Sequence, residues 1–101
     1  MKTTQSGKRY DSDYMEALAE NTSYSNGNNV SGGQYLKIAS DGTFWLYQTS
    51  NGQDGYRDSF LRYLGETPEC ARDALDEYVL DEITEKQEER LIELKIIEIV
   101  P

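Results

Sequence analysis

The sequence predicts a small single domain of the α+β class, in which a β-hairpin and a C-terminal strand form a mainly antiparallel sheet packed by two or three helices. Three observations predict this class. Two β-prone runs flank Asp41-Gly42, a dipeptide typical of tight hairpins. Apolar residues after Thr67-Pro68 recur at helical spacing. A length of 101 residues leaves room for one modest core, so residues 1–101 are expected to be one domain.

The first third of the chain gives weaker signals. Residues 1–10 are polar without a hydrophobic period, and we expect them to fray. Asp13 is followed three residues later by Glu16, which predicts a short helix over 13–20, because Asp13 can cap it. Its buried side would carry Tyr14, Met15 and Leu18. Residues 21–33 are rich in Asn, Ser and Gly and are predicted to form a long polar loop.

The hairpin is the clearest local prediction. Residues 34–40 and 43–49 are rich in residues that favour strands, and Asp41-Gly42 between them suits a two-residue type I′ turn. Such a turn pairs Ser40 with Thr43 and places Gly42 at positive φ.

The turn type also fixes which strand residues share a face of the sheet. With Ser40 opposite Thr43, Ile38 pairs with Trp45 and Leu36 pairs with Tyr47. We expect helices to cover this face and Trp45 to be well buried. The opposite face would be closed by a further element or by a partner, and it would carry Tyr35, Phe44 and Leu46.

Residues 56–64 fit two structures. Phe60, Leu61 and Leu64 would lie on one face of a helix, whereas Phe60, Arg62 and Leu64 alternate as in a strand. The helix is favoured, and Gly65 would end it.

A further helix is predicted to begin at Thr67-Pro68, because Thr suits the N-cap and Pro the first helical position. Its buried stripe comprises Ala71, Ala74, Leu75, Tyr78, Val79 and Ile83. Residues 91–100 are mostly Ile and Leu with interleaved charges, which predicts a strand with a bulge at Ile96-Ile97. A continuous helix from Pro68 is the alternative for this region.

Negative charge is concentrated in the last third of the chain. Residues 66–98 hold twelve of the nineteen acidic residues against four basic ones, whereas residues 1–65 are almost neutral. Acids recur there at every fourth position, at Glu69, Asp73, Glu77, Asp81, Glu85, Glu89 and Glu93. On a helix such neighbours lie about 6 Å apart, and each like-charged pair costs about 0.2–0.5 kcal/mol. A positively charged partner would relieve that repulsion; a charged face that serves solubility alone is the alternative.

The residue inventory excludes several kinds of catalytic and metal site. The chain has no His and one Cys, which leaves no ordinary catalytic triad and too few ligands for zinc. It also has no glycine-rich phosphate loop. We therefore expect a non-enzymatic protein with no metal and no cofactor.

The sequence carries no signal for secretion or membrane insertion. No apolar run follows the basic residues near the N-terminus, and no stretch reaches the roughly 18 apolar residues of a membrane span. Cys70 stands alone, so an internal disulfide is excluded, which agrees with a reducing compartment. We expect a cytoplasmic protein. Its net charge of −9 and pI near 4.3 disfavour direct binding to nucleic acid or membranes.

These observations predict a protein that binds and blocks a basic surface of another macromolecule, such as a nucleic-acid-binding protein or complex. The candidate partner-binding residues are Glu69, Asp73, Asp76, Glu77, Asp81, Glu85 and Tyr35. Tyr35 is included because an aromatic residue in a polar context often anchors an interface. In size, acidity and lack of catalytic residues the chain resembles the phage-encoded inhibitors of bacterial defence, the anti-CRISPR and anti-restriction proteins. That resemblance implies inhibition by a DNA mimic and assigns no particular residues.

Other functions are open at this point. An immunity protein or antitoxin would neutralise a toxic nuclease through the same acidic surface, and a neighbouring toxin gene would distinguish it. A sheet-based DNA-binding module is the second alternative, because Tyr63-Leu64-Gly65 leading into Thr67-Pro68 is similar to the strand-to-helix joint of integrase arm-binding domains. The net charge argues against that module. A small enzyme would need an apolar cleft around a carboxylate or Cys70.

Overall fold

The computed structural model describes residues 1–22, 33–49 and 59–101. Its elements in chain order are β1 (Lys2–Gln5), β2 (Lys8–Asp11), a 3-10 turn (Ser12–Tyr14), β3 (Glu16–Asn21), β4 (Gln34–Ile38), β5 (Phe44–Gln48), β6 (Phe60–Gly65), α1 (Pro68–Glu77) and α2 (Glu85–Glu93). Strands β3, β4, β5 and β6 form an antiparallel sheet in that order, and β1 pairs with β2 in a separate hairpin. The α+β class is therefore confirmed.

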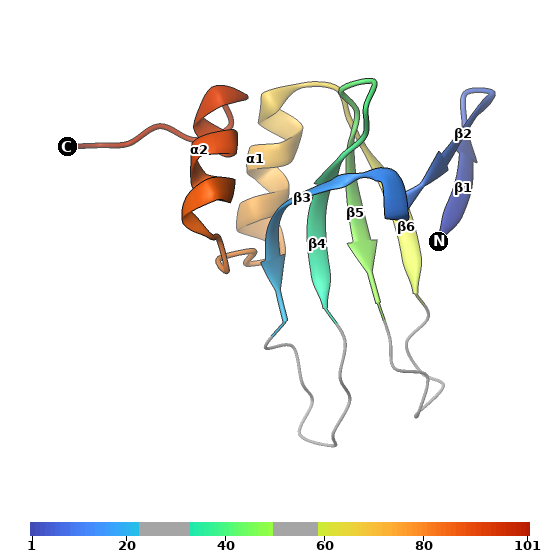
Figure 1. Cartoon of the computed structure of the whole chain (residues 1–101), viewed down its shortest axis with the longest axis horizontal. Helices are drawn as coiled ribbons and strands as arrows, with labels where there is room; N and C mark the ends of the chain where they lie inside the picture. The colour runs from blue at the N-terminus through green and yellow to red at the C-terminus, as the bar shows by residue number, and fades with distance from the viewer. Residues whose placement is uncertain (23–32, 50–58) are drawn as a thin grey trace, which may run out of the picture.

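The two helices pack on one face of the four-stranded sheet. Helix α1 lies against β4, β5 and β6, and α2 lies against β3. In Figure 1 the helices and the β1–β2 hairpin lie on opposite sides of this sheet. The core lies between the helices and the sheet, where the buried residues include Leu18, Leu36, Leu46, Ala74, Leu80, Leu91 and Ile96.

Strands β4 and β5 form the predicted hairpin, but the predicted register is wrong by one residue. The Ala39 amide donates to the Thr43 carbonyl at 2.9 Å, and the Gly42 amide donates to the Ala39 carbonyl at 3.0 Å. The loop therefore has three residues, 40–42, with Gly42 at the predicted positive φ of 87°. A loop of this kind, with a left-handed residue at its end, competes with the two-residue turn for the same dipeptide.

The observed register exchanges the inner and outer residues of β5 and leaves those of β4 as predicted. Ile38 pairs with Phe44 and Leu36 pairs with Leu46, so these four side chains face the helices. Trp45 lies opposite Lys37 instead of Ile38, on the face turned away from the helices. The predicted inner face is therefore correct for β4 and wrong for β5, although Trp45 is buried as predicted, with 1% of its surface exposed.

The N-terminal hairpin buries Trp45. The Tyr10 ring lies 4.7 Å from the Trp45 ring, centroid to centroid, and the Tyr63 ring lies 5.3 Å away on an edge. The Tyr10 hydroxyl donates to a carboxylate oxygen of Asp41 at 2.6 Å. The prediction that residues 1–10 fray is therefore wrong. Tyr10 makes tertiary contacts that the polar composition of this segment does not indicate.

Residues 13–20 are not the predicted helix. They contain the end of the 3-10 turn and most of β3, and the Tyr14 side chain is 86% exposed. A register shift between Ala17 and Ala19 leaves Leu18 and Ala19 both fully buried. Two successive buried residues break the alternation of a strand and resemble a helical pattern, which explains the error.

Two predicted segments lie partly outside the described residues. The predicted loop 21–33 begins later than expected, because Asn21 is the last residue of β3, and residues 23–32 are not among those described. The favoured helix over 56–64 is wrong for 60–64, which belong to β6, while 56–58 also lie outside the described residues. The alternation of Phe60, Arg62 and Leu64 was the correct signal.

Helix α1 begins as predicted and ends early. The Thr67 side chain caps it by accepting from the Cys70 amide, and Pro68 is the first helical residue. After Glu77 the Leu80 amide donates to the Leu75 carbonyl at 3.0 Å, and Val79 takes a positive φ of 51°. These are the features of a Schellman ending, with Leu80 buried behind it. Val79 and Ile83 therefore do not extend a helical stripe.

The C-terminal region is helical where a strand was predicted. Thr84 and Gln87 form a capping box, which starts α2. The helix ends at Glu93, and the Ile96 amide then donates to the Leu91 carbonyl at 2.9 Å. The predicted strand over 91–100 is wrong. The continuous helix is wrong too, because Glu82 leaves the helical path and exchanges two backbone hydrogen bonds with Glu20 at the edge of β3.

We expect Gly42→Val to lower the free energy of unfolding by about 1–2 kcal/mol, because a branched side chain is strained at positive φ. A side chain there would meet no atom within 4 Å, so the backbone alone causes the effect. Chemical denaturation would measure it, with Ser40→Val in the same loop as the control. Equal stability of Gly42→Val and the wild type would refute the three-residue turn.

A second expectation concerns Asp41. Hydrogen bonds from Thr43 and then from Tyr10 lower the pKa of its carboxyl from 3.8 to about 2. The ionised form is thus favoured by folding, so its stabilising effect is complete above pH 3.8 and is lost as the pH falls towards 2. The stability difference between the wild type and Asp41→Asn should shrink across that window in denaturation at constant ionic strength. A difference independent of pH would contradict this role.

Candidate functional site

Four of the predicted partner-binding acids share the outer face of α1. Glu69, Asp73, Asp76 and Glu77 are all exposed. At 3.6 residues per turn they form one stripe, on the side of the helix opposite the buried Ala71 and Ala74. We call these four residues the acidic α1 face.

The regular series of acids from Glu69 to Glu93 does not form one line. Asp81 lies in the connection between the helices, and Glu85 is the first residue of α2. Within α1, the acids of this series that lie four residues apart are the pairs Glu69/Asp73 and Asp73/Glu77. Because the chain turns after α1, the repulsion within this helix comes from these two pairs and amounts to about 0.4–1 kcal/mol.

Tyr35 lies apart from the acidic α1 face. It belongs to β4 and pairs with Tyr47 on the sheet face turned away from the helices, with 6.0 Å between the two ring centroids. Burial, followed by the negative charge of Glu20, raises the pKa of its hydroxyl. The structure does not bring Tyr35 together with the acids of α1.

The acidic α1 face has no ion-pair partner within the described part of the chain. Arg72, on the same helix, does not reach these carboxylates, because its guanidinium donates to the Ile96 carbonyl at 2.9 Å and to the Lys95 carbonyl at 3.1 Å. Asp76 and Glu77 also lie in a last turn that has no basic residue. There the helix dipole is negative, which costs about 0.3–1 kcal/mol for each acid.

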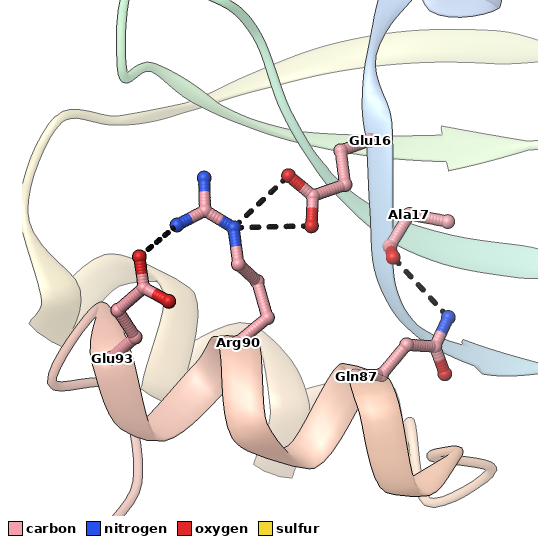
Figure 2. A network of polar contacts seen from close by, with 5 residues as sticks. All are labelled: Glu16, Ala17, Gln87, Arg90 and Glu93. Atoms are coloured by element: carbon pink, nitrogen blue, oxygen red, sulfur yellow. Dashed lines mark hydrogen bonds and ion pairs between the residues drawn. The ribbon is translucent and has the colours of Figure 1, made fainter.

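Arg90 is the basic residue of this region that does pair with carboxylates (Figure 2). Its Nε lies 3.1 Å from both carboxylate oxygens of Glu16 on β3, and its Nη1 lies 2.9 Å from Glu93. Beside it, Gln87 Nε2 donates to the Ala17 carbonyl at 3.2 Å. The hydrogen bond and charge of Glu16 raise the pKa of Arg90. These contacts dock α2 on β3, so Arg90 is not available to neutralise α1.

A groove of about 450 Å³ lies beside the N-terminal hairpin. It is lined by Lys2, Arg9, Tyr10, Asp11, Tyr14, Met15, Ala39 and Ser40. This groove was not predicted, because residues 1–10 were expected to fray. A signal was present, since Ser6 and Gly7 between two short polar runs suit a tight turn, and both take positive φ.

The described residues include no group of three or more His, Cys, Asp or Glu side chains placed to hold a metal ion. Neither described helix is long and apolar enough to cross a membrane.

Comparison with known proteins adds no relative. No protein-family model matches the chain, and searches of curated proteins and of solved structures return no match.

Proposed function

We propose that this protein is a small non-enzymatic inhibitor that docks the acidic α1 face on a basic surface of a nucleic-acid-binding protein or complex. It acts by competition, with carboxylates taking the place of phosphates. The role that fits this chemistry is that of a phage-encoded inhibitor of bacterial defence, of the anti-CRISPR or anti-restriction type. Inhibition is then stoichiometric, because no bond in the target is made or broken.

One observation carries the proposal: carboxylates gather on α1 where they disfavour the helix, and the two arginines of the helical region are engaged elsewhere. Asp76 and Glu77 oppose the helix dipole, and Arg72 and Arg90 are held by internal hydrogen bonds. Folding alone gives no reason for this placement. A basic partner would offset both the repulsion among the carboxylates and their unfavourable interaction with the helix dipole. The same carboxylates would attract it from a distance.

The length of α1 limits how much of an interface it can supply. Glu69 to Glu77 spans about 12 Å along the helix axis. A standard interface buries about 800 Å² on each partner, which is more than one short helix face offers. Asp81 and Glu85 follow α1 in the chain and are exposed, so we include them in the docking surface. Tyr35 is left out, because it lies on the other side of the sheet.

The same surface would serve an immunity protein or antitoxin, and only the identity of the partner separates that role from a phage inhibitor. A sheet-based DNA-binding module is a poorer candidate. The strand-to-helix joint at β6 and α1 exists, but α1 presents carboxylates to solvent, which repel phosphates.

The test compares two variants of equal net charge. Asp73→Asn, Asp76→Asn and Glu77→Gln together remove three negative charges from α1, and the control Asp13→Lys with Glu98→Gln makes the same change in net charge at exposed positions elsewhere. The partner is first captured with the wild-type protein from a host lysate and purified. We expect the α1 variant to bind it at least about tenfold more weakly, with a weaker salt dependence, while its unfolding free energy rises by about 0.5–2 kcal/mol.

Stability and binding must therefore change in opposite directions in the α1 variant. The control variant should bind within about twofold of the wild type, since exposed charges outside an interface contribute little. Unchanged affinity of the α1 variant, or an equal loss in the control, would refute docking through α1.

A further inference from the structure

We propose that the groove beside the N-terminal hairpin binds a small ligand that combines a phosphate group with a planar ring, of the nucleotide class. The groove lies between β2, the 3-10 turn and the loop that joins β4 to β5. Its volume, about 450 Å³, falls within the range of small-molecule sites. It is formed by elements other than α1, so this proposal and the proposed inhibitory function can fail separately.

The groove carries positive charge although the chain as a whole carries −9. Lys2 and Arg9 are exposed, and neither has an ion pair among the described residues. Within the described part of the chain, Arg9 makes an uncharged contact, a hydrogen bond from Nη1 to the Thr4 hydroxyl at 3.0 Å. A guanidinium and an ammonium group at one groove suit a phosphate, since the first offers paired donors and the second a point charge.

The acid in the groove does not cancel these two cations. Asp11 lies 3.9 Å from the N-terminal amine of Met1, and its side chain accepts from the Asp13 amide at 3.0 Å. Its charge is thus already balanced within the hairpin. The neighbouring Lys8 is in the opposite situation, because it lies 3.8 Å from Asp41 and is not part of the lining.

Tyr14 supplies the surface for a planar ring. Its side chain is 86% exposed at the groove, while the adjacent Met15 is 8% exposed and forms an apolar part of the lining. Tyrosine faces stack well on nucleobases, whatever the base. Ser40 offers a hydroxyl at the side formed by the β4–β5 loop. The groove therefore places phosphate-binding and ring-binding groups within one small volume.

Charge favours a free nucleotide over a nucleic acid. Repulsion by a chain of net charge −9 grows with the number of phosphates that approach it. A mononucleotide brings one phosphate, which Lys2 and Arg9 can neutralise locally, whereas a polynucleotide brings many that meet the acidic remainder of the surface.

The test is calorimetric titration of the full chain at low salt with four probes: a nucleoside monophosphate, inorganic phosphate, the nucleoside alone and a short single-stranded oligonucleotide. We expect the monophosphate to bind one to one with a dissociation constant below about 1 mM, and phosphate or nucleoside alone to bind at least about tenfold more weakly. Failure of the monophosphate to bind at millimolar concentration would overturn the proposal. An oligonucleotide that binds more tightly than the monophosphate would overturn its restriction to small ligands.

Single variants then assign the groups. Lys2→Gln and Arg9→Gln should each weaken the monophosphate and inorganic phosphate about tenfold, whereas Tyr14→Ala should weaken the monophosphate alone. Lys86→Gln on α2 makes the same charge change as Lys2→Gln and should leave binding unchanged. Lys2 and Tyr14 are exposed, so these substitutions leave the core intact, and unfolding curves would verify it. Equal loss in Lys86→Gln, or no loss in Tyr14→Ala, would refute this site.

Discussion

The register between β4 and β5 is the constraint on which the rest of the structure depends. Because side chains alternate across a strand, a shift of one residue would exchange every inner and outer side chain of one strand relative to the other. The three-residue loop sets the observed register, with Gly42 at positive φ and the Asp41 side chain accepting from the Thr43 amide. Leu36 and Leu46 then face the helices, and Trp45 lies on the other side, where Tyr10 of the N-terminal hairpin covers it.

This two-sided sheet separates surfaces of opposite charge. The helices on one side present the acidic α1 face, and the hairpin on the other side presents Lys2 and Arg9 beside the groove. The two arginines of the helical region serve the packing, since Arg72 holds the segment after α2 and Arg90 joins α2 to Glu16. The carboxylates of α1 are left facing solvent, while the cationic groove persists in a strongly acidic chain.

Short sequence motifs correctly predicted those features of the fold that local interactions determine. The α+β class, strands β4 and β5, the Thr67 cap and the positive φ of Gly42 followed from short motifs. Errors arose where a distant contact decided between local alternatives. Glu82 ends the helical path by pairing with Glu20, and Tyr10 orders a polar hairpin by stacking on Trp45. For the site, the sequence located the exposed acids of α1, but it could not show that Tyr35 faces the other way or that Lys2 and Arg9 share a groove.

Proton–proton contacts between β4 and β5 in nuclear magnetic resonance spectra test the register most directly. The Ala39 amide bonds to the Thr43 carbonyl, so the next pair, Ile38 with Phe44, is a close pair without mutual hydrogen bonds. Leu36 and Leu46 form the same kind of pair two residues further on, where Cα atoms approach to about 4.5 Å. We expect strong α-proton contacts at both pairs. Contacts that join Lys37 to Leu46 and Ala39 to Phe44 instead would show the two-residue turn and would contradict the separation of the two faces.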